Sequence, residues 1–111
     1  MQKRILIATD KLGHGNAKLG AILMTNFIYT LARADEKPLA ITLMNEGVRL
    51  ACAGSECLED MKLLAENGVA VKACGTCLDF LGLRERLEVG EIGDIKSAVD
   101  ALLADSVLTI G

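Results

Sequence analysis

The chain has 111 residues, 51% of them apolar and only 3% aromatic, and its formal net charge is −3. This length predicts one domain, residues 1–111, large enough to fold without disulfide or metal staples. The mixed charges give no reason to expect a nucleic acid or a membrane as partner, and no apolar stretch is long enough to span a bilayer. We therefore expect a cytoplasmic protein whose four cysteines stay reduced and serve chemistry or metal binding.

The first part of the chain predicts a strand, a helix and a second strand. Residues 5–8 form an unbroken apolar run, which is typical of a strand covered on both faces. Residues 18–35 predict a helix that ends before Pro38, and its apolar residues cover more than one face. That excess indicates either a subunit interface or a helix half-buried by its own domain. Residues 39–44 predict the second strand, and a turn begins at Asn45.

The rest of the chain continues this alternation. Helices are predicted at residues 55–67, 76–81 and 94–104, and strands at residues 69–73, 88–92 and 107–110. Ser55 and Asp94 are the expected caps of the first and the last of these helices. Strands that alternate with helices pair in parallel through right-handed crossovers. We therefore expect an α/β fold around a mainly parallel sheet of roughly five strands.

Two cysteines lie at the junction between the third strand and the next helix, in KACGTCLDF. Thr76 and Asp79 have the spacing of a capping box, which makes Cys77 the first helical residue. Cys74 then ends the strand, and Gly75 allows the backbone to bend between the two thiols.

The position of Cys74 predicts a nucleophile. Cysteines at the start of a helix can have a pKa of about 3.5–7.5 instead of ~8.5, which favours the thiolate. Ligands of open α/β sheets bind at the carboxyl ends of the strands, where Cys74 is expected. A thiolate there would attack sulfur, selenium or a disulfide. The alternative is a buried, inert cysteine that only packs.

Cys52 and Cys57 follow the second strand, and whether they reach Cys74 depends on the order of the strands. With Cys74 and Cys77 they would make a four-cysteine metal site, although only one half has the C-x2-C spacing of a zinc knuckle. A thioredoxin-type pair is another interpretation, but the proline between the cysteines and the antiparallel strands are missing. A disulfide between Cys74 and Cys77 would then be a transient state.

The polar loop at residues 10–17 is expected at the same edge of the sheet, with Asp10 at its start. Its glycines miss the G-x-G-x-x-G spacing, so we reject nucleotide binding on that motif. His14, the only histidine, is either a proton shuttle or, as we prefer, a solvated loop residue.

Several segments carry a resemblance to a known family. They are ILIATDKLGHG, MNEGVRLACAGSECLEDMKLL, CGTCLDFLGL and VGEIGDI. Through them nearly the whole chain resembles the DsrE/DsrF-like family, and within it the carboxyl-terminal domain of YedF-type proteins. Those proteins are described as sulfurtransferase-like and are linked to selenium metabolism.

The resemblance implies a three-layer α/β/α sandwich that assembles into dimers, trimers or hexamers. Sulfur-relay members hold a persulfide on a cysteine just after the third strand, which corresponds to Cys74 here. Cys77, Cys52 and Cys57 are additional and belong to the YedF-like branch. YedF-type proteins usually begin with a TusA-like domain bearing a Cys-Pro-x-Pro motif, which we expect to be absent because Pro38 is the only proline.

These observations lead to one main hypothesis and two alternatives. The main one is a sulfur or selenium carrier that holds a persulfide on Cys74, uses Cys77 to resolve it, needs no cofactor and exchanges sulfur with donor and acceptor proteins. Gly75, Thr76, Asp79, Asn45, Cys52, Cys57 and Asp10 would line or support the site. The alternatives are a four-cysteine metal module and an oligomeric assembly domain with inert cysteines.

Overall fold

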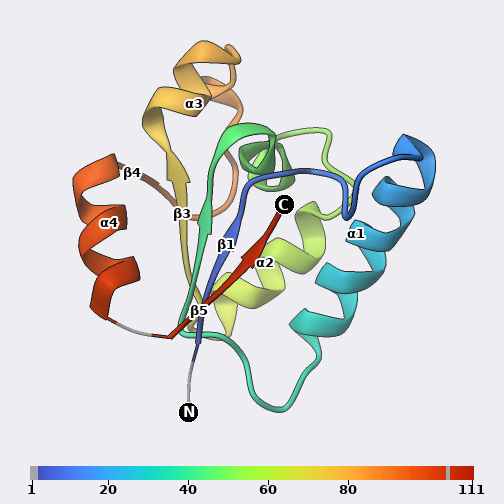
Figure 1. Cartoon of the computed structure of the whole chain (residues 1–111), viewed down its shortest axis with the longest axis horizontal. Helices are drawn as coiled ribbons and strands as arrows, with labels where there is room; N and C mark the ends of the chain where they lie inside the picture. The colour runs from blue at the N-terminus through green and yellow to red at the C-terminus, as the bar shows by residue number, and fades with distance from the viewer. Residues whose placement is uncertain (1–2, 105) are drawn as a thin grey trace.

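Five parallel strands form one sheet in the order β4-β3-β2-β1-β5 in this computed structural model, which describes residues 3–104 and 106–111 (Figure 1). The strands are β1 (Arg4–Ile7), β2 (Ala40–Leu43), β3 (Ala70–Cys74), β4 (Glu91–Gly93) and β5 (Val107–Ile110). The α-helices are α1 (Ala17–Ala32), α2 (Leu58–Glu66), α3 (Gly75–Phe80) and α4 (Ile95–Ala104), and the 3-10 helices are η1 (Asn45–Ala51) and η2 (Arg84–Arg86). The predicted α/β fold is confirmed, and every strand pair in the described residues is parallel.

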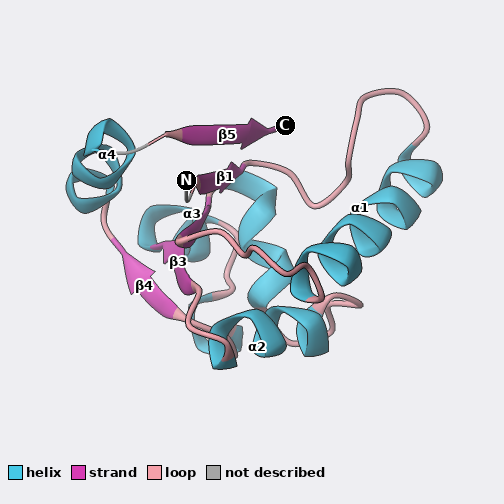
Figure 2. Ribbon diagram, turned by 90° about the horizontal axis from the view of Figure 1, so that it is seen from below, coloured by secondary structure: helices cyan, strands magenta, loops and turns pink. Residues whose placement is uncertain are grey.

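The helices lie on both faces of the sheet, as Figure 2 shows, with α1 and α2 on one face and α4 on the other. Alternate residues of each strand point to opposite faces. On the α1–α2 face the register aligns Ile5 with Ile41 and Ile41 with Val71, and all three side chains belong to the buried core. This face therefore holds the main hydrophobic core.

The opposite face is covered more thinly. Thr42 and Lys72 are register partners on this face, and Cys74 pairs with Gly93 at its carboxyl end. Only α4 lies over it among the described helices, and none of the α4 residues is buried. Space consequently remains between α4 and the sheet, and this space becomes important for the candidate site.

Of the two helix caps predicted at Ser55 and Asp94, one agrees with the structure and the other does not. The Asp94 carboxylate accepts a hydrogen bond from the Ser97 amide at 2.7 Å, which confirms it as the α4 cap. Helix α2, however, begins at Leu58 rather than at Ser55. The reason is a turn in which the Ser55 amide donates to the Cys52 carbonyl while the Ser55 hydroxyl accepts from the Cys57 amide.

Strand β4 is shorter than predicted and starts at Glu91. The amides of Glu88 and Val89 donate instead to the Ala51 carbonyl, so these residues are not part of the sheet ladder. Gly90 has φ +79, and a Cβ at this position would collide with the Val71 carbonyl oxygen. Only a glycine lets the chain turn so closely against β3 before it enters β4.

Helix α1 carries apolar residues beyond its core-facing side. Met24 and Ile28 are buried, whereas Leu19, Ile22 and Tyr29 are about half exposed. The predicted excess of apolar residues is therefore real, and it lies on the surface of the chain. The subunit interface that it suggests stays a prediction. In the part of the chain that the structure describes, no helix is both long and apolar enough to cross a membrane.

Candidate functional site

Cys74 lies where β3 passes directly into α3, at the carboxyl end of the sheet. Its side chain is partly buried. The next residue, Gly75, is buried and closely packed, because a Cβ would lie 3.1 Å from both an Arg84 Nη2 atom and an Ile92 methyl group. A larger residue beside Cys74 would push the side chains of η2 and β4 outward by a few tenths of an ångström.

The predicted capping box is wrong. Helix α3 begins at Gly75, two residues before the expected first helical residue Cys77, and no side chain caps it. The Asp79 carboxylate instead accepts two hydrogen bonds from Arg84, at 2.5 Å from Nε and 3.0 Å from Nη2. The bond from Arg84 lowers the pKa of Asp79. A bidentate charged partner competes well against a neutral amide, which explains why Asp79 anchors Arg84 rather than the helix start.

Cys77 lies in the first turn of α3, and its sulfur is next to two other groups of the site. The Asn45 amide donates a hydrogen bond to Cys77 Sγ at 3.1 Å. Asn45 has a positive φ of 50°, a conformation that asparagine tolerates better than most residues, and this turn directs its N–H toward α3. The second group is the Cys74 thiol, whose interaction with the Cys77 thiol contributes to the pKa of Cys77. Cys77 thus lies next to both Asn45 and Cys74.

The pKa of Cys77 is raised rather than lowered. Burial is the main cause, and the hydrogen bond with Cys74 adds to it, while the Asn45 amide acts in the opposite direction. The expected thiolate-stabilising effect of the helix start is therefore overridden at this residue. Helix α3 has only six residues, and burial of a thiol disfavours its charged form. Cys77 consequently keeps its proton at neutral pH.

Cys52 and Cys57 lie elsewhere. Both are buried, and they line a separate pocket of about 280 Å³ together with Asp10. Cys52 Sγ donates to the Val48 carbonyl at 3.2 Å, whereas Cys57 Sγ lies 4.0 Å from its polar neighbour, a threonine hydroxyl. Burial raises the pKa of both thiols. Cys52 and Cys57 are therefore protonated core side chains.

The four-cysteine metal site is not formed. Within residues 3–104 and 106–111, no three Cys, His, Asp or Glu side chains are arranged as ligands of one metal ion. Cys52 and Cys57 do not line the cavity on which Cys74 opens, because η1 carries the chain away from β2 and into the core before Cys52 is reached. The metal alternative is therefore wrong for the described residues.

The loop after β1 also lies apart from Cys74. Asp10 forms an ion pair with Lys11 at 3.2 Å and lines the pocket of Cys52 and Cys57. His14 is exposed and lines a third pocket, which it shares with Asn45. Its exposure agrees with a solvated loop histidine. Asp10 was expected to support the Cys74 site, and the structure does not bring it to the Cys74 cavity.

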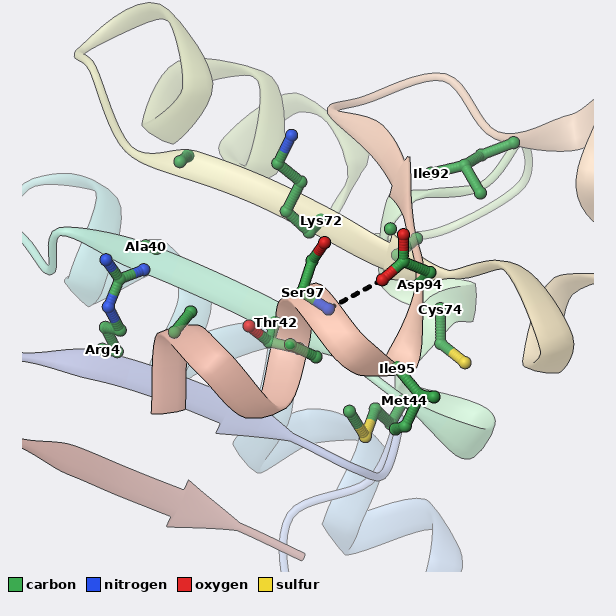
Figure 3. Close-up of a pocket in the computed structure, with 15 residues that line it drawn as sticks. Arg4, Ala40, Thr42, Met44, Lys72, Cys74, Ile92, Asp94, Ile95 and Ser97 are labelled. Carbon is green, nitrogen blue, oxygen red and sulfur yellow. Dashed lines mark hydrogen bonds between the residues drawn. The ribbon is translucent and has the colours of Figure 1, made fainter. Parts of the chain in front are cut away.

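Cys74 opens on a cavity of about 220 Å³ between α4 and the sheet (Figure 3). Besides Cys74, the polar and charged residues that line it are Arg4, Thr42, Lys72, Asp94 and Ser97. Sequence analysis missed Thr42 and Lys72. The signal was present, because Lys72 lies two residues before Cys74 on the same strand and so shares its face. Thr42 was missed because the sequence does not show that β2 and β3 are adjacent in the sheet.

Fold and site together define a parallel α/β protein with two contacting, partly buried thiols at the carboxyl edge of its sheet. No protein-family model matches the chain, and no curated protein matches it. Solved structures, in contrast, are similar to the chain. The ychN protein of E. coli aligns with a TM-score of 0.64 and 23% identity, over 98% of this chain and 99% of that chain.

A second similar structure is MTH1491 of Methanobacterium thermoautotrophicum, a protein of unknown function. It aligns with a TM-score of 0.63 and 17% identity, over 97% of this chain and 99% of that chain. At these identities the likeness shows a shared fold. The predicted architecture thus has counterparts among solved proteins of almost the same extent.

Proposed function

We propose that this protein is a sulfur or selenium carrier that holds a persulfide, or its selenium analogue, on Cys74. The observation that carries the proposal is the position of this thiol. Cys74 ends a strand, opens on a cavity and contacts the thiol of Cys77, which keeps its proton. A protonated Cys77 can donate a hydrogen bond to sulfur on Cys74, whether that sulfur is a thiolate or a persulfide.

Loading follows ordinary thiol exchange. The Cys74 thiolate attacks the terminal sulfur of a donor, R–S–SH. A bond forms between Cys74 Sγ and that sulfur while the S–S bond of the donor breaks, and the donor leaves as R–S⁻. The proton stays on the transferred sulfur. No net oxidation occurs, because the sulfane sulfur moves from one thiol to another.

Unloading can proceed in two ways. An acceptor thiolate can take the terminal sulfur by the same reaction in reverse. Alternatively, the sulfur of Cys77 attacks the inner sulfur of the Cys74 persulfide while the Cys77 proton passes to the terminal sulfur; a Cys74–Cys77 disulfide forms, and the terminal sulfur leaves as hydrogen sulfide. In that second route two cysteines are oxidised and the sulfane sulfur is reduced to sulfide, so the electrons balance. An external dithiol must then reduce the disulfide before another cycle.

The family resemblance supports the same proposal. We infer that the chain is a DsrE/DsrF-like protein of the YedF type, whose donor and acceptor are other proteins, such as a TusA-like domain. Homo-oligomerisation forms part of the proposal, because Leu19, Ile22 and Tyr29 leave apolar surface exposed on α1. Light scattering of the purified chain would test the oligomer separately from the chemistry.

Intact-mass spectrometry under non-reducing conditions tests the carrier. The full chain should gain one sulfur atom after incubation with glutathione persulfide and lose it on treatment with dithiothreitol. Cys74→Ser should abolish the gain, and Cys52→Ala, the control, should keep it. A gain that persists in Cys74→Ser would overturn the assignment of Cys74.

A further inference from the structure

The cavity beside Cys74 contains a buried hydroxyl group that needs a partner. Thr42 is only 7% exposed and is the buried polar residue of the core. Within the described residues, the Thr42 hydroxyl makes no hydrogen bond. Every side-chain oxygen or nitrogen there that is fully enclosed by protein does have a hydrogen-bond partner. The Thr42 oxygen is therefore not sealed in protein but opens on the cavity that it lines. A polar group in this setting is costly unless the occupant of the cavity bonds to it.

The sheet register sets the distance between this hydroxyl and the reactive thiol. Thr42 and Lys72 are neighbours across β2 and β3, and Cys74 lies two residues further along β3 on the same face. With a rise of about 3.3 Å per residue, the Cα positions of Lys72 and Cys74 are roughly 7 Å apart along the strand. Figure 3 shows these residues on the sheet beneath α4. A molecule that touches both Thr42 and Cys74 must be about as long as an amino acid.

The size of the cavity agrees with that length. About 220 Å³ is less than the ~300–1,000 Å³ of pockets that hold drug-sized ligands. Small side chains keep the cavity open, since alanines line it from both layers: Ala40, Ala70 and Ala73 on the sheet, and Ala98 and Ala101 on α4. A tripeptide thiol such as glutathione is longer than the span from Thr42 to Cys74, so we expect it to fit this cavity less well than an amino acid does.

The charges give the cavity a direction. Arg4 and Lys72 are its cationic lining residues, and Lys72 also pairs with Glu91 at the sheet edge. Asp94 follows β4 at the end where Cys74 lies and is held by the Ser97 amide. An anionic ligand is therefore favoured with its negative group away from Asp94, toward Thr42 and the cationic residues.

From these observations we propose that the cavity binds a low-molecular-weight persulfide of amino-acid size, or its selenium analogue, as the sulfur donor. Its terminal sulfur lies at Cys74 and its carboxylate points to Thr42 and the cationic end. This inference rests on the proposed function; it keeps the protein acceptor and assigns a small molecule, in place of a protein, as the sulfur donor. The reaction is the loading step already described, with an amino-acid thiolate as the leaving group.

The test compares two donors that carry the same reactive group. Cysteine persulfide is expected to fit the cavity better than glutathione persulfide does. The rate of sulfur gain on Cys74 is followed by quenched-flow sampling and intact mass, using the full chain. We expect cysteine persulfide to load at least about tenfold faster. Ala101→Leu fills the cavity and should remove that advantage, whereas Ala104→Leu, the same change at an exposed position of α4, should keep it.

A second pair of variants tests the recognition of the carboxylate. Thr42→Val preserves shape but removes the hydroxyl, and it should slow loading by cysteine persulfide about fivefold while leaving the slower glutathione reaction unchanged. Thr30→Val, on the exposed surface of α1, is the matched control. If both donors load equally and Ala101→Leu behaves as Ala104→Leu does, the cavity inference is wrong and the carrier stands. If neither donor loads Cys74, the carrier proposal fails as well.

Discussion

The two cysteine pairs of this chain follow neighbouring parallel strands, yet they differ in burial and in what surrounds their thiols. Cys74 comes directly after β3, remains partly buried and opens on a cavity. Cys52 comes after β2 and the intervening η1, and it is buried in the core. The comparison teaches that the path of the backbone after the strand, rather than the spacing of the cysteines, decides which thiol is accessible to solvent.

The largest expected difference between the pairs is their rate of alkylation. Cys52 and Cys57 are 2% and 4% exposed, so a reagent reaches them only after local opening of the fold. In the native protein, iodoacetamide should therefore modify Cys74 about 100-fold faster than either of them. Peptide mapping over a time course measures all four sites in one sample. Equal rates of alkylation at Cys74 and at Cys52 and Cys57 would contradict the difference in burial between the two pairs.

The second difference is the cost of replacing a thiol by a hydroxyl. Cys57→Ser places a polar group in the core, where the shorter side chain does not reach the Thr25 hydroxyl, which already lies 4.0 Å from the sulfur. We expect a loss of about 1–3 kcal/mol in the free energy of unfolding. Cys74→Ser should cost less than ~0.5 kcal/mol, because its hydroxyl faces the cavity. Urea denaturation of both variants measures the two losses in the free energy of unfolding. A larger loss for Cys74→Ser than for Cys57→Ser would contradict the prediction.

The two cysteine regions were not equally predictable. The strands and helices follow from apolar periodicity, and the junction between β3 and α3 follows from the run that ends at Cys74. The contact between Cys77 and the Asn45 amide required knowledge that β2 neighbours β3, since the two residues are far apart in sequence. The capping box failed for a different reason. Arg84, which lies beyond the helix, competes for Asp79, and local spacing carries no information about such a partner.

The free energy of unfolding at alkaline pH depends on the buried, protonated thiols. Burial raises the pKa of Cys52, Cys57 and Cys77 in the folded state, so unfolding releases their protons more easily. The resulting stability is complete below the unfolded pKa of ~8.5 and is lost as the pH rises toward the folded values. The free energy of unfolding should therefore fall between pH 8 and pH 10, and less steeply in a Cys52→Ala, Cys57→Ala double variant. A pH-independent free energy in the unmodified chain would contradict the buried, protonated assignment.

The Cys74–Cys77 contact has its own titration signature. The hydrogen bond with Cys74 contributes to the raised pKa of Cys77, so Cys74→Ala should lower the pKa of Cys77. Thiolate absorbance at 240 nm, with Cys52 and Cys57 replaced by alanine in both proteins compared, isolates the effect. An unchanged titration midpoint would indicate that the two thiols do not interact.

The smallest expected effect on the free energy of unfolding comes from Thr76, which does not cap helix α3. Thr76→Ala should change the free energy of unfolding by less than ~0.5 kcal/mol, the usual range for an exposed position. Asn16→Ala is the matched comparison, because the Asn16 side chain caps α1 through the Leu19 amide at 2.9 Å and its loss should cost about 1 kcal/mol. Equal losses would restore the capping box.

The central claim is that, of the four cysteines, Cys74 is the one that carries sulfur, and a single measurement on the unaltered chain tests it most directly. The protein is loaded with cysteine persulfide, its free thiols and persulfides are capped, and the peptides that carry the four cysteines are mapped by tandem mass spectrometry. The account predicts that the added sulfur is found on Cys74, with any Cys74–Cys77 disulfide as the only other product. Added sulfur on Cys52 or Cys57 in the folded protein, with Cys74 unmodified, would contradict it.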